Sequence, residues 1–279
     1  MKAIPLPLVL RLSAVAVVLL SGACSDDDPT GPGPVQGRQM YAVDGSNQLR
    51  EIDSDNPDEE RSTVAITGMA SGETMVGIDF NAADGLLYGV GSAGNVYRVN
   101  LTSGLATRVG AGPVASLSGQ FFGVDFNPVP NRLRIHSETG LNLRVDQTIG
   151  VLAATDVVLA FVTADANAGA TPNIVASAYT NSVTPAPMTT VLFAIDSDLD
   201  VLANFADPNT GQMTTVGSLG VDVGDAAGFD IAGDDGTAYA ALTTGTSGSS
   251  LYTIDLASGQ TTLIGSIGGE AIVGLAVAP

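Results

Sequence analysis

The chain has 279 residues, with 10 lysines and arginines against 29 aspartates and glutamates, so its formal net charge is −19. It contains one cysteine, one histidine and no tryptophan. Surfaces that bind nucleic acid or anionic lipid need clusters of lysine and arginine, so this balance disfavours both as partners of the folded part. One histidine also excludes metal sites built from several histidines, and one cysteine excludes an internal disulfide.

The first 23 residues have the pattern of a secretory signal peptide. The apolar run 12–20 is shorter than the roughly 20 residues that a membrane span requires. The small residues of "SGAC" lead directly to Cys24, which resembles a bacterial lipobox with Cys24 as the lipidated residue. An ordinary signal peptide followed by a chance cysteine is the alternative.

Residues 24–38 are acidic and then rich in proline and glycine, which predicts a flexible tether. Ser25, rather than an aspartate, follows the cysteine. In the bacterial lipoproteins that this pattern resembles, this choice favours the outer membrane over the inner one. We therefore expect a lipid-anchored protein of the bacterial cell envelope that touches the membrane only through its N-terminal lipid.

The strongest signal in the sequence is an internal repeat. The hairpin that follows "GIDF" aligns without a gap with the one that follows "GVDF", and "GFDI" opens another copy. Each copy contains four short apolar segments separated by Gly, Asn, Asp and Ser turns, without a sustained helical period. Four antiparallel strands repeated every 40–50 residues or so are typical of β-propeller blades.

The two ends of the chain complement each other as parts of one blade. Residues 39–68 lack an opening strand, and residues 271–279 supply one. We therefore predict an all-β, five-bladed β-propeller over residues 39–279, with four-stranded antiparallel blades and a ring closed by the C-terminal strand. The predicted blades are 271–279 with 39–68, 76–110, 122–156, 172–217 and 227–265. Six blades are the alternative if 157–217 is split, because 157–174 is either a strand with a long loop or an insertion.

Several segments together resemble one protein family. They include "FGVDFNPVPNRLRIHSETGLNLRVD", "ADANAG", "TTVLFAIDSDLDVLANF" and "LYTIDLASGQTTLIGSIG". They resemble the uncharacterised bacterial family called domain of unknown function 4394, and the resemblance covers residues 39–279. It implies a secreted propeller, and it carries over no catalytic residue because the family has no established activity. His136 departs from the aliphatic or polar residue expected at its position.

Asp79, Asp125 and Asp230 recur in the repeats, on the predicted innermost strands. One interpretation is a ring of carboxylates facing the central channel and binding a hard cation such as Ca²⁺, the one cofactor that the sequence suggests. The other, favoured by the repetition, is a structural hydrogen bond to the backbone of a neighbouring blade. The acidic turns 53–60 and 196–200 lack the glycine and closing glutamate of an EF-hand, which indicates solvated turns.

The hairpin 131–146 gathers scarce cations on one face, because alternate residues of a strand share a face. The candidate ligand-binding residues are Arg132, Arg134, His136 and Arg144. A three-residue turn predicts that Arg132 faces Asp146, Arg134 faces Arg144 and His136 faces Asn142. Two facing arginines need an anion between them. That anion is either a carboxylate-bearing ligand or acidic side chains of adjacent blades in a salt-bridge network.

The expected function is a binding or interaction module of the cell envelope, with an envelope protein or a carbohydrate as partner and a monomeric state. No nucleophile elbow is present, and the sequence favours binding over catalysis. A calcium-dependent hydrolase or lyase acting on sugars or lactones is the alternative, and a purely structural envelope role is another. The long loops between blades share one end of the ring with the loops between second and third strands, which we expect to include 181–189 and 242–250. A ligand site is therefore expected at that end or in the central channel.

Overall fold

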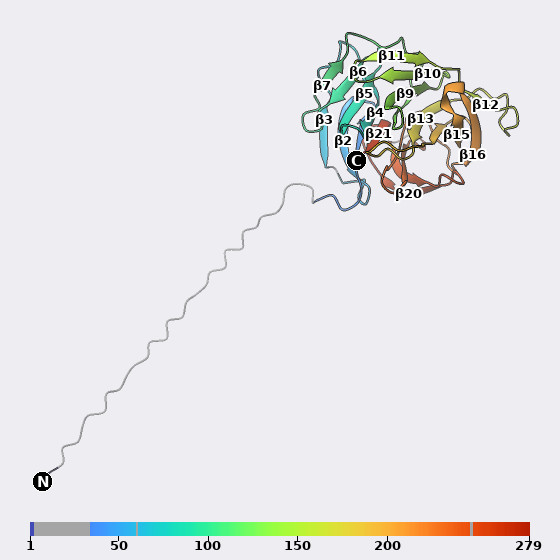
Figure 1. The fold of residues 1–279 in the computed structure, drawn as a ribbon. Helices are drawn as coiled ribbons and strands as arrows, with labels where there is room; N and C mark the ends of the chain where they lie inside the picture. Colours follow the sequence, from blue (N-terminus) through green and yellow to red (C-terminus); the bar gives the residue numbers. More distant parts are fainter. Residues whose placement is uncertain (3–33, 60, 246–247) are drawn as a thin grey trace. The chain divides into compact units, whose positions relative to one another are not determined.

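The computed structural model describes residues 1–2, 34–59, 61–245 and 248–279 (Figure 1). The chain divides into two units, Met1–Gly31 and Pro32–Pro279, and every described strand lies in the second. The predicted signal peptide and Cys24 lie outside the described residues, apart from Met1 and Lys2. Among the residues that are described, no helix is both long and apolar enough to span a bilayer.

The second unit is a five-bladed β-propeller, and blade 1 joins the two ends of the chain as predicted. Its strands, from the centre outward, are β21 (Ile272–Val277), β1 (Gln39–Asp44), β2 (Gln48–Asp53) and β3 (Ser62–Ala65). Blade 2 consists of β4 (Met75–Asn81), β5 (Leu86–Gly91), β6 (Val96–Val99) and β7 (Ala106–Val109). Blade 3 consists of β8 (Phe122–Asn127), β9 (Arg132–Ser137), β10 (Asn142–Asp146) and β11 (Val151–Thr155).

Blade 4 differs from the others by one additional strand. Its strands are β13 (Ile174–Tyr179), β14 (Leu192–Asp196), β15 (Val201–Asp207) and β16 (Gln212–Ser218), with the 3₁₀ turn η1 (Pro208–Thr210) before β16. The short β12 (Ala160–Phe161) pairs in parallel with the outer edge of β16. Segment 157–174 is therefore a short strand with a long loop, and no sixth blade forms. Blade 5 consists of β17 (Ala227–Ile231), β18 (Ala238–Leu242), β19 (Ser250–Ile254) and β20 (Thr261–Ser266).

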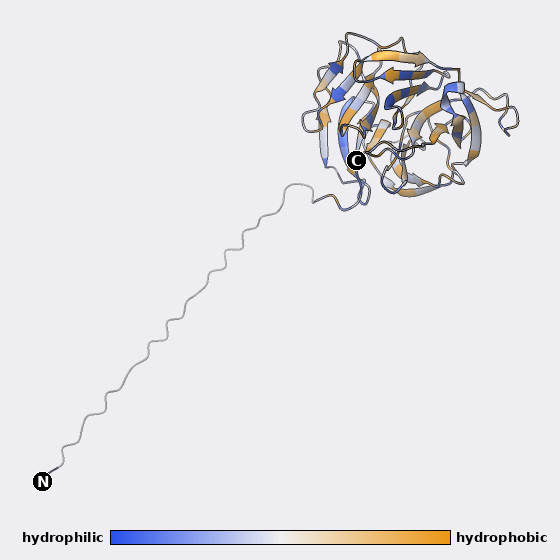
Figure 2. Ribbon diagram, in the orientation of Figure 1, coloured by the Kyte–Doolittle hydropathy of each residue, from blue (hydrophilic) through white to orange (hydrophobic). Residues whose placement is uncertain are grey.

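Local chemistry explains the tight turns between first and second strands. Asn81 Oδ1 accepts a hydrogen bond from Ala83 N at 2.9 Å, and Asn127 Oδ1 accepts one from Val129 N at 3.0 Å. Such turns bend the chain without backbone partners from elsewhere. Hydrophobic stretches occur in strands around the whole ring (Figure 2). Inner strands such as β4 and β13 are buried along their entire length.

The glycines of the "GxD" repeats allow the innermost strands to approach closely. The innermost strands contact one another in the order β21, β4, β8, β13, β17 and back to β21, which closes the ring. A Cβ on Gly123 would lie 2.6 Å from the backbone nitrogen of Ser177, and one on Gly228 would lie 2.7 Å from that of Leu275. At this level the channel narrows to a space of about 10 Å³, which is no larger than a single water site.

One loop lies elsewhere than the sequence indicated. Segment 181–189 was expected between the second and third strands of blade 4, but it connects β13 to β14, the first and second strands. The expectation was wrong because the opening strand of this divergent copy, "IVASAY", lacks the "GxDF" pattern that marks the strand elsewhere. The correction moves this long loop to the end of the ring that carries the compact turns.

Candidate functional site

A cavity of about 240 Å³ opens at the end of the ring where the first-to-second-strand turns lie. We call it the mouth cavity. The turns of blades 2, 4 and 5 meet there with the C-terminus and with Arg38, at the predicted end of the tether. Its lining includes Arg38, Asp79, Phe80, Ala82, Ser182, Val183, Thr184, Asp230, Ile231, Asp234, Val277, Ala278 and Pro279. From the sequence, a ligand site was expected either at the end of the ring with the long loops between blades or in the central channel. This cavity lies at the opposite end from those loops, but it is on the channel.

The floor of the mouth cavity belongs to a group of three carboxyls. Asp79, Asp125 and Asp230, here the carboxyl triad, each place an oxygen within 4.8 Å of the other two. They are 4%, 1% and 4% exposed, and Asp79 and Asp230 line the cavity itself. Three recurring aspartates from three blades therefore converge on one point of the channel.

Each member of the triad also accepts a backbone hydrogen bond from the next blade. Asp79 accepts from Phe126 N at 2.7 Å, Asp125 from Tyr179 N at 3.1 Å, and Asp230 from Val277 N at 2.6 Å. Tyr179 and Val277 follow Ala178 and Ala276, the alanines that take the aspartate position in blades 4 and 1. These contacts are the inter-blade hydrogen bonds anticipated from the repetition, while cation binding by the triad stays a prediction.

The surroundings of the triad favour its protonated forms. Burial and the neighbouring Asp230 raise the pKa of Asp79 well above its usual value. Burial, then the charges of Asp79 and Asp230, raise the pKa of Asp125 in the same way. Burial raises the pKa of Asp230 to about 7 in spite of two backbone hydrogen bonds that lower it. Carboxyls this close cannot all ionise unless a positive charge enters, so the triad holds protons or a cation at neutral pH.

The rim of the mouth cavity carries one cation, and that cation is paired. Arg38 forms ion pairs with Asp234 at 2.9 Å and with Asp235 at 2.8 Å, across the turn that follows β17. Just before it, Gln36 N and Gly37 N donate to Asp53 at 2.7 and 2.9 Å. The last residues of the predicted tether are thereby held against the propeller beside the cavity.

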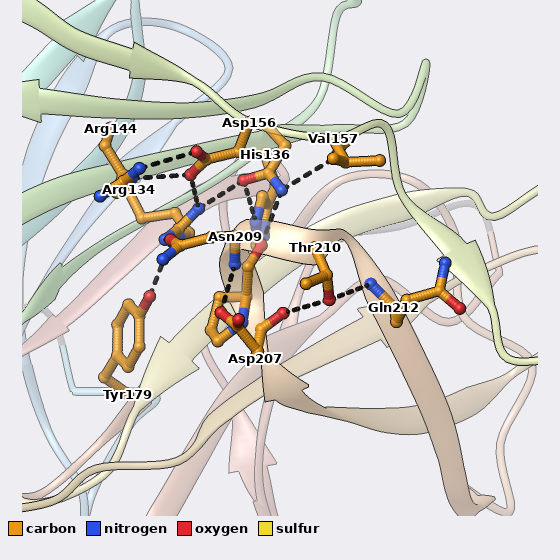
Figure 3. Close-up of polar contacts among 12 residues, drawn as sticks. Arg134, His136, Arg144, Asp156, Val157, Tyr179, Asp207, Asn209, Thr210 and Gln212 are labelled. Atoms are coloured by element: carbon orange, nitrogen blue, oxygen red, sulfur yellow. Dashed lines mark hydrogen bonds and ion pairs between the residues drawn. The ribbon is translucent and has the colours of Figure 1, made fainter.

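The arginine hairpin has the predicted register. Arg134 faces Arg144 and His136 faces Asn142 in the β9–β10 pairing, and Arg132 forms an ion pair with Asp146 at 3.1 Å. The anion between the two facing arginines is Asp156, immediately after β11 (Figure 3). Its Oδ2 accepts from Arg134 Nη1 at 2.9 Å and from Arg144 Nε at 2.7 Å, and its Oδ1 accepts from Arg144 Nη2 at 2.9 Å.

Arg134 is 1% exposed, and all three of its guanidinium nitrogens donate hydrogen bonds to protein acceptors. Besides Asp156, it donates to Tyr179 Oη at 2.8 Å, Asn209 Oδ1 at 2.8 Å and Asn142 Oδ1 (Figure 3). Tyr179 and Asn209 belong to blade 4, so the network joins two blades. The carboxylate of this network is that of Asp156, which directly follows β11 of blade 3. It therefore does not come from an adjacent blade, as the salt-bridge interpretation had expected. Ligand binding at this hairpin gains no support from these contacts.

His136 lies in the same buried network. Its ring stacks on Phe205 with centroids 5.3 Å apart, and its Nε2 lies 3.2 Å from Asn142 Oδ1. Burial and the nearby charge of Arg134 lower the pKa of His136 to about 3. The imidazole is therefore neutral at physiological pH, which suits packing between blades and removes a charged role at neutral pH.

The two acidic turns are only partly solvated, which corrects the expectation. Asp53 is 1% exposed and accepts from the backbone of residues 36, 37 and 55, and Asp196 is fully buried and accepts from Asn173 N and Leu199 N. Asp55 and Asp198 are exposed. The leading aspartate of each turn is thus an acceptor for backbone groups, a role that the acidic pattern did not distinguish from solvation.

Comparison with known proteins identifies a family model and distant structures. The family model described as a domain of unknown function (DUF4394) matches residues 48–276. No curated protein matches. Solved structures with partial similarity include the dihydro-heme d1 dehydrogenase NirN in complex with DHE (16% identity, TM-score 0.39), covering 84% of this chain and 45% of that one.

Two further structures resemble the chain to a similar degree. A nidogen/laminin complex has 10% identity and a TM-score of 0.49, covering 87% of this chain and 99% of that one. A structural-genomics protein of unknown function from Bacteroides thetaiotaomicron has 17% identity and a TM-score of 0.47, covering 79% and 56%. The match to NirN covers less than half of the length of that chain. All three TM-scores lie below 0.5, so these similarities carry no argument about function.

Proposed function

The chain belongs to the family described as a domain of unknown function (DUF4394), and from this premise we propose that it is a binding module of the bacterial cell envelope. The mouth cavity is its ligand site. The observation that carries this proposal is a concave, largely apolar cavity whose floor presents buried polar groups, the usual form of a small-molecule site. Backbone hydrogen bonds to the triad join blade 2 to blade 3, blade 3 to blade 4 and blade 5 to blade 1 beneath the cavity.

Binding is favoured over catalysis by the chemistry around the cavity. A hydrolase of the nucleophilic type needs a nucleophile within hydrogen-bond reach of a base. The single histidine of the chain is buried in the arginine hairpin and does not line the cavity. Among the described lining residues, Ser182 and Thr184 are the hydroxyl groups, and neither has a hydrogen bond to a histidine.

The experiment is a thermal-shift screen of small envelope metabolites and oligosaccharides. A ligand at 100 times its Kd adds about 2.7 kcal/mol, which is roughly 5–10 °C in Tm for a domain of this size. Ala82 lines the mouth cavity, so Ala82→Trp should abolish the shift. The matched control is Ala93→Trp, which places the same side chain in an exposed turn of the same blade. A ligand that shifts the Ala82→Trp protein as much as the wild type would refute the cavity as its site.

The anchoring of this module is part of the proposal. We infer that Cys24 is lipidated after removal of the signal peptide, and that Ser25 directs the protein to the outer membrane. Residues 36–38 leave the propeller beside the mouth cavity, so a membrane tether would hold the cavity close to its anchoring point. The partner would be an envelope protein or carbohydrate, and the protein would be a monomer. Labelled palmitate incorporated by the wild type but not by Cys24→Ser is the expected result.

A calcium-dependent hydrolase or lyase acting on sugars or lactones is the second candidate. The observation in its favour is the triad, whose three oxygens within 4.8 Å could contact one cation. Calorimetric titration with Ca²⁺ tests it. Binding by the wild type that Asp125→Asn abolishes would support this candidate, while the absence of heat and of any Tm shift would remove it.

A further inference from the structure

The mouth cavity combines an apolar wall with an acidic floor. Phe80, Val183, Ile231 and Val277 line the wall, and Asp79 and Asp230 lie at the floor. Its volume of about 240 Å³ is below the roughly 300–1,000 Å³ of sites for drug-sized ligands. The cavity therefore suits a small molecule that has a hydrocarbon body and one polar end.

The charge of the cavity selects the sign of that polar end. Arg38 is the only cation of the described lining, and Asp234 and Asp235 pair with it. Arg134 lies opposite Asp125 in the β8–β9 pairing, but its guanidinium donates to Tyr179, Asn142, Asp156 and Asn209. Among the described residues, no arginine forms an ion pair with the triad. An anionic ligand would meet uncompensated carboxyls in a buried place, whereas a cation would relieve their mutual repulsion.

The triad also has acceptor capacity left for a ligand. Each oxygen of Asp79 and of Asp230 accepts one backbone N–H, and a carboxylate oxygen has two lone pairs. Asp125 is 1% exposed, and its one hydrogen bond within the described residues goes from Tyr179 N to Oδ1. Its Oδ2 accepts no hydrogen bond from those residues, which leaves acceptor capacity for a ligand.

The separation of the triad oxygens is compatible with an ammonium group. Three N–H groups directed tetrahedrally at oxygens about 2.8 Å away hold those oxygens about 4.6 Å apart. The triad oxygens lie within 4.8 Å of one another. A Ca²⁺ ion takes 6–8 oxygen ligands, and beyond the carboxyls the cavity wall is mainly hydrocarbon, with Ser182 and Thr184 as its hydroxyl groups.

We propose that the mouth cavity binds a small primary amine with an apolar body, whose ammonium group donates to Asp79, Asp125 and Asp230. The proposal rests on the proposed function, because it names the ligand class of the same cavity. The apolar body lies against Phe80, Ile231 and Val277. The ligand enters past the Arg38–Asp234 ion pair at the rim.

The test uses three probes of one shape on the whole secreted chain. Cyclohexylamine, cyclohexanol and cyclohexanecarboxylate differ in charge and hardly in size, and calorimetry at pH 7 measures their Kd values. We expect cyclohexylamine to bind at least tenfold more tightly than the other two, and CaCl₂ to compete weakly. Equal binding of the alcohol, tighter binding of the carboxylate, or no binding of the amine at millimolar concentration would overturn the proposal.

Two variants separate this inference from the function on which it rests. Asp125→Asn keeps an acceptor for Tyr179 N and removes charge from the triad, and should weaken amine binding at least tenfold. Ala82→Trp fills the cavity and leaves the triad intact, and should weaken all three probes. If the alcohol binds as well as the amine and Ala82→Trp abolishes both, the cavity is a site of another ligand class. If Ala82→Trp changes nothing, the proposed function itself fails. Since the probe series needs only the wild type, poor folding of a variant leaves the test decisive.

Discussion

Replacing Asp156 by asparagine should destabilise the propeller more than most single substitutions. Asp156→Asn keeps the size of the side chain and removes the charge that lies between Arg134 and Arg144. The side chains of Arg134 and Asp156 are 2% and 6% exposed, so the ion pair is buried. Removing one partner of such a pair typically costs about 3–5 kcal/mol, because the other charge stays buried without compensation.

That cost is a large share of the free energy of unfolding of a native domain, which is about 5–15 kcal/mol. Urea unfolding followed by circular dichroism measures it, with the m-value as a check on the two-state assumption. The matched control is Arg132→Ala, which breaks the half-exposed ion pair to Asp146 in the same hairpin. It should cost no more than about 1 kcal/mol. A loss below 1 kcal/mol for Asp156→Asn, or equal losses for both variants, would refute the reasoning.

Two further predictions concern the ring and the triad. Gly123→Ala should destabilise by about 1–3 kcal/mol in urea unfolding, because its Cβ would meet the backbone nitrogen of Ser177 at 2.6 Å. Gly112→Ala, with open space around it, should change little, and equal effects would contradict the argument. The free energy of unfolding should also fall as pH rises from about 4 towards 7 and above. The folded triad retains protons that the unfolded chain releases, with the pKa of Asp230 raised to about 7. A flat profile in that window for the wild type, or an equal slope in Asp230→Asn, would contradict this assignment.

Much of the architecture could be predicted from the sequence because the repeat encodes it locally. Short apolar strands separated by turn residues recur in each blade, and the complementary ends of the chain predict the closure at β1 and β21. The register of the arginine hairpin follows from its three-residue turn, since a turn of fixed length determines which residues face each other. Apart from the closure, which joins the two ends of the chain, these features depend on neighbours that are close in the chain.

Other features depend on residues that are far apart in the chain. The sequence places an aspartate in three blades, but it does not state the radius of the ring, which brings three oxygens within 4.8 Å. The glycine two residues before each aspartate was a usable signal, because only a close approach of strands requires it. Asp156 was missed as the anion of the hairpin, although it is the only acidic residue between 147 and 164. The lining of the mouth cavity by Arg38, Ser182 and Val277 had no local signal.

The most direct test of the mouth cavity as a ligand site is a titration of the isotope-labelled full chain with cyclohexylamine, followed by backbone amide NMR spectra. We expect saturable shifts centred on the amides of Phe80, Ile231 and Val277, which line the mouth cavity and donate to the triad. The amides of β10 should shift less, because β10 lies on the far side of β9 from β8, the strand that carries Asp125. Shifts centred on the hairpin, or no saturable shifts at all, would contradict the mouth cavity as the ligand site.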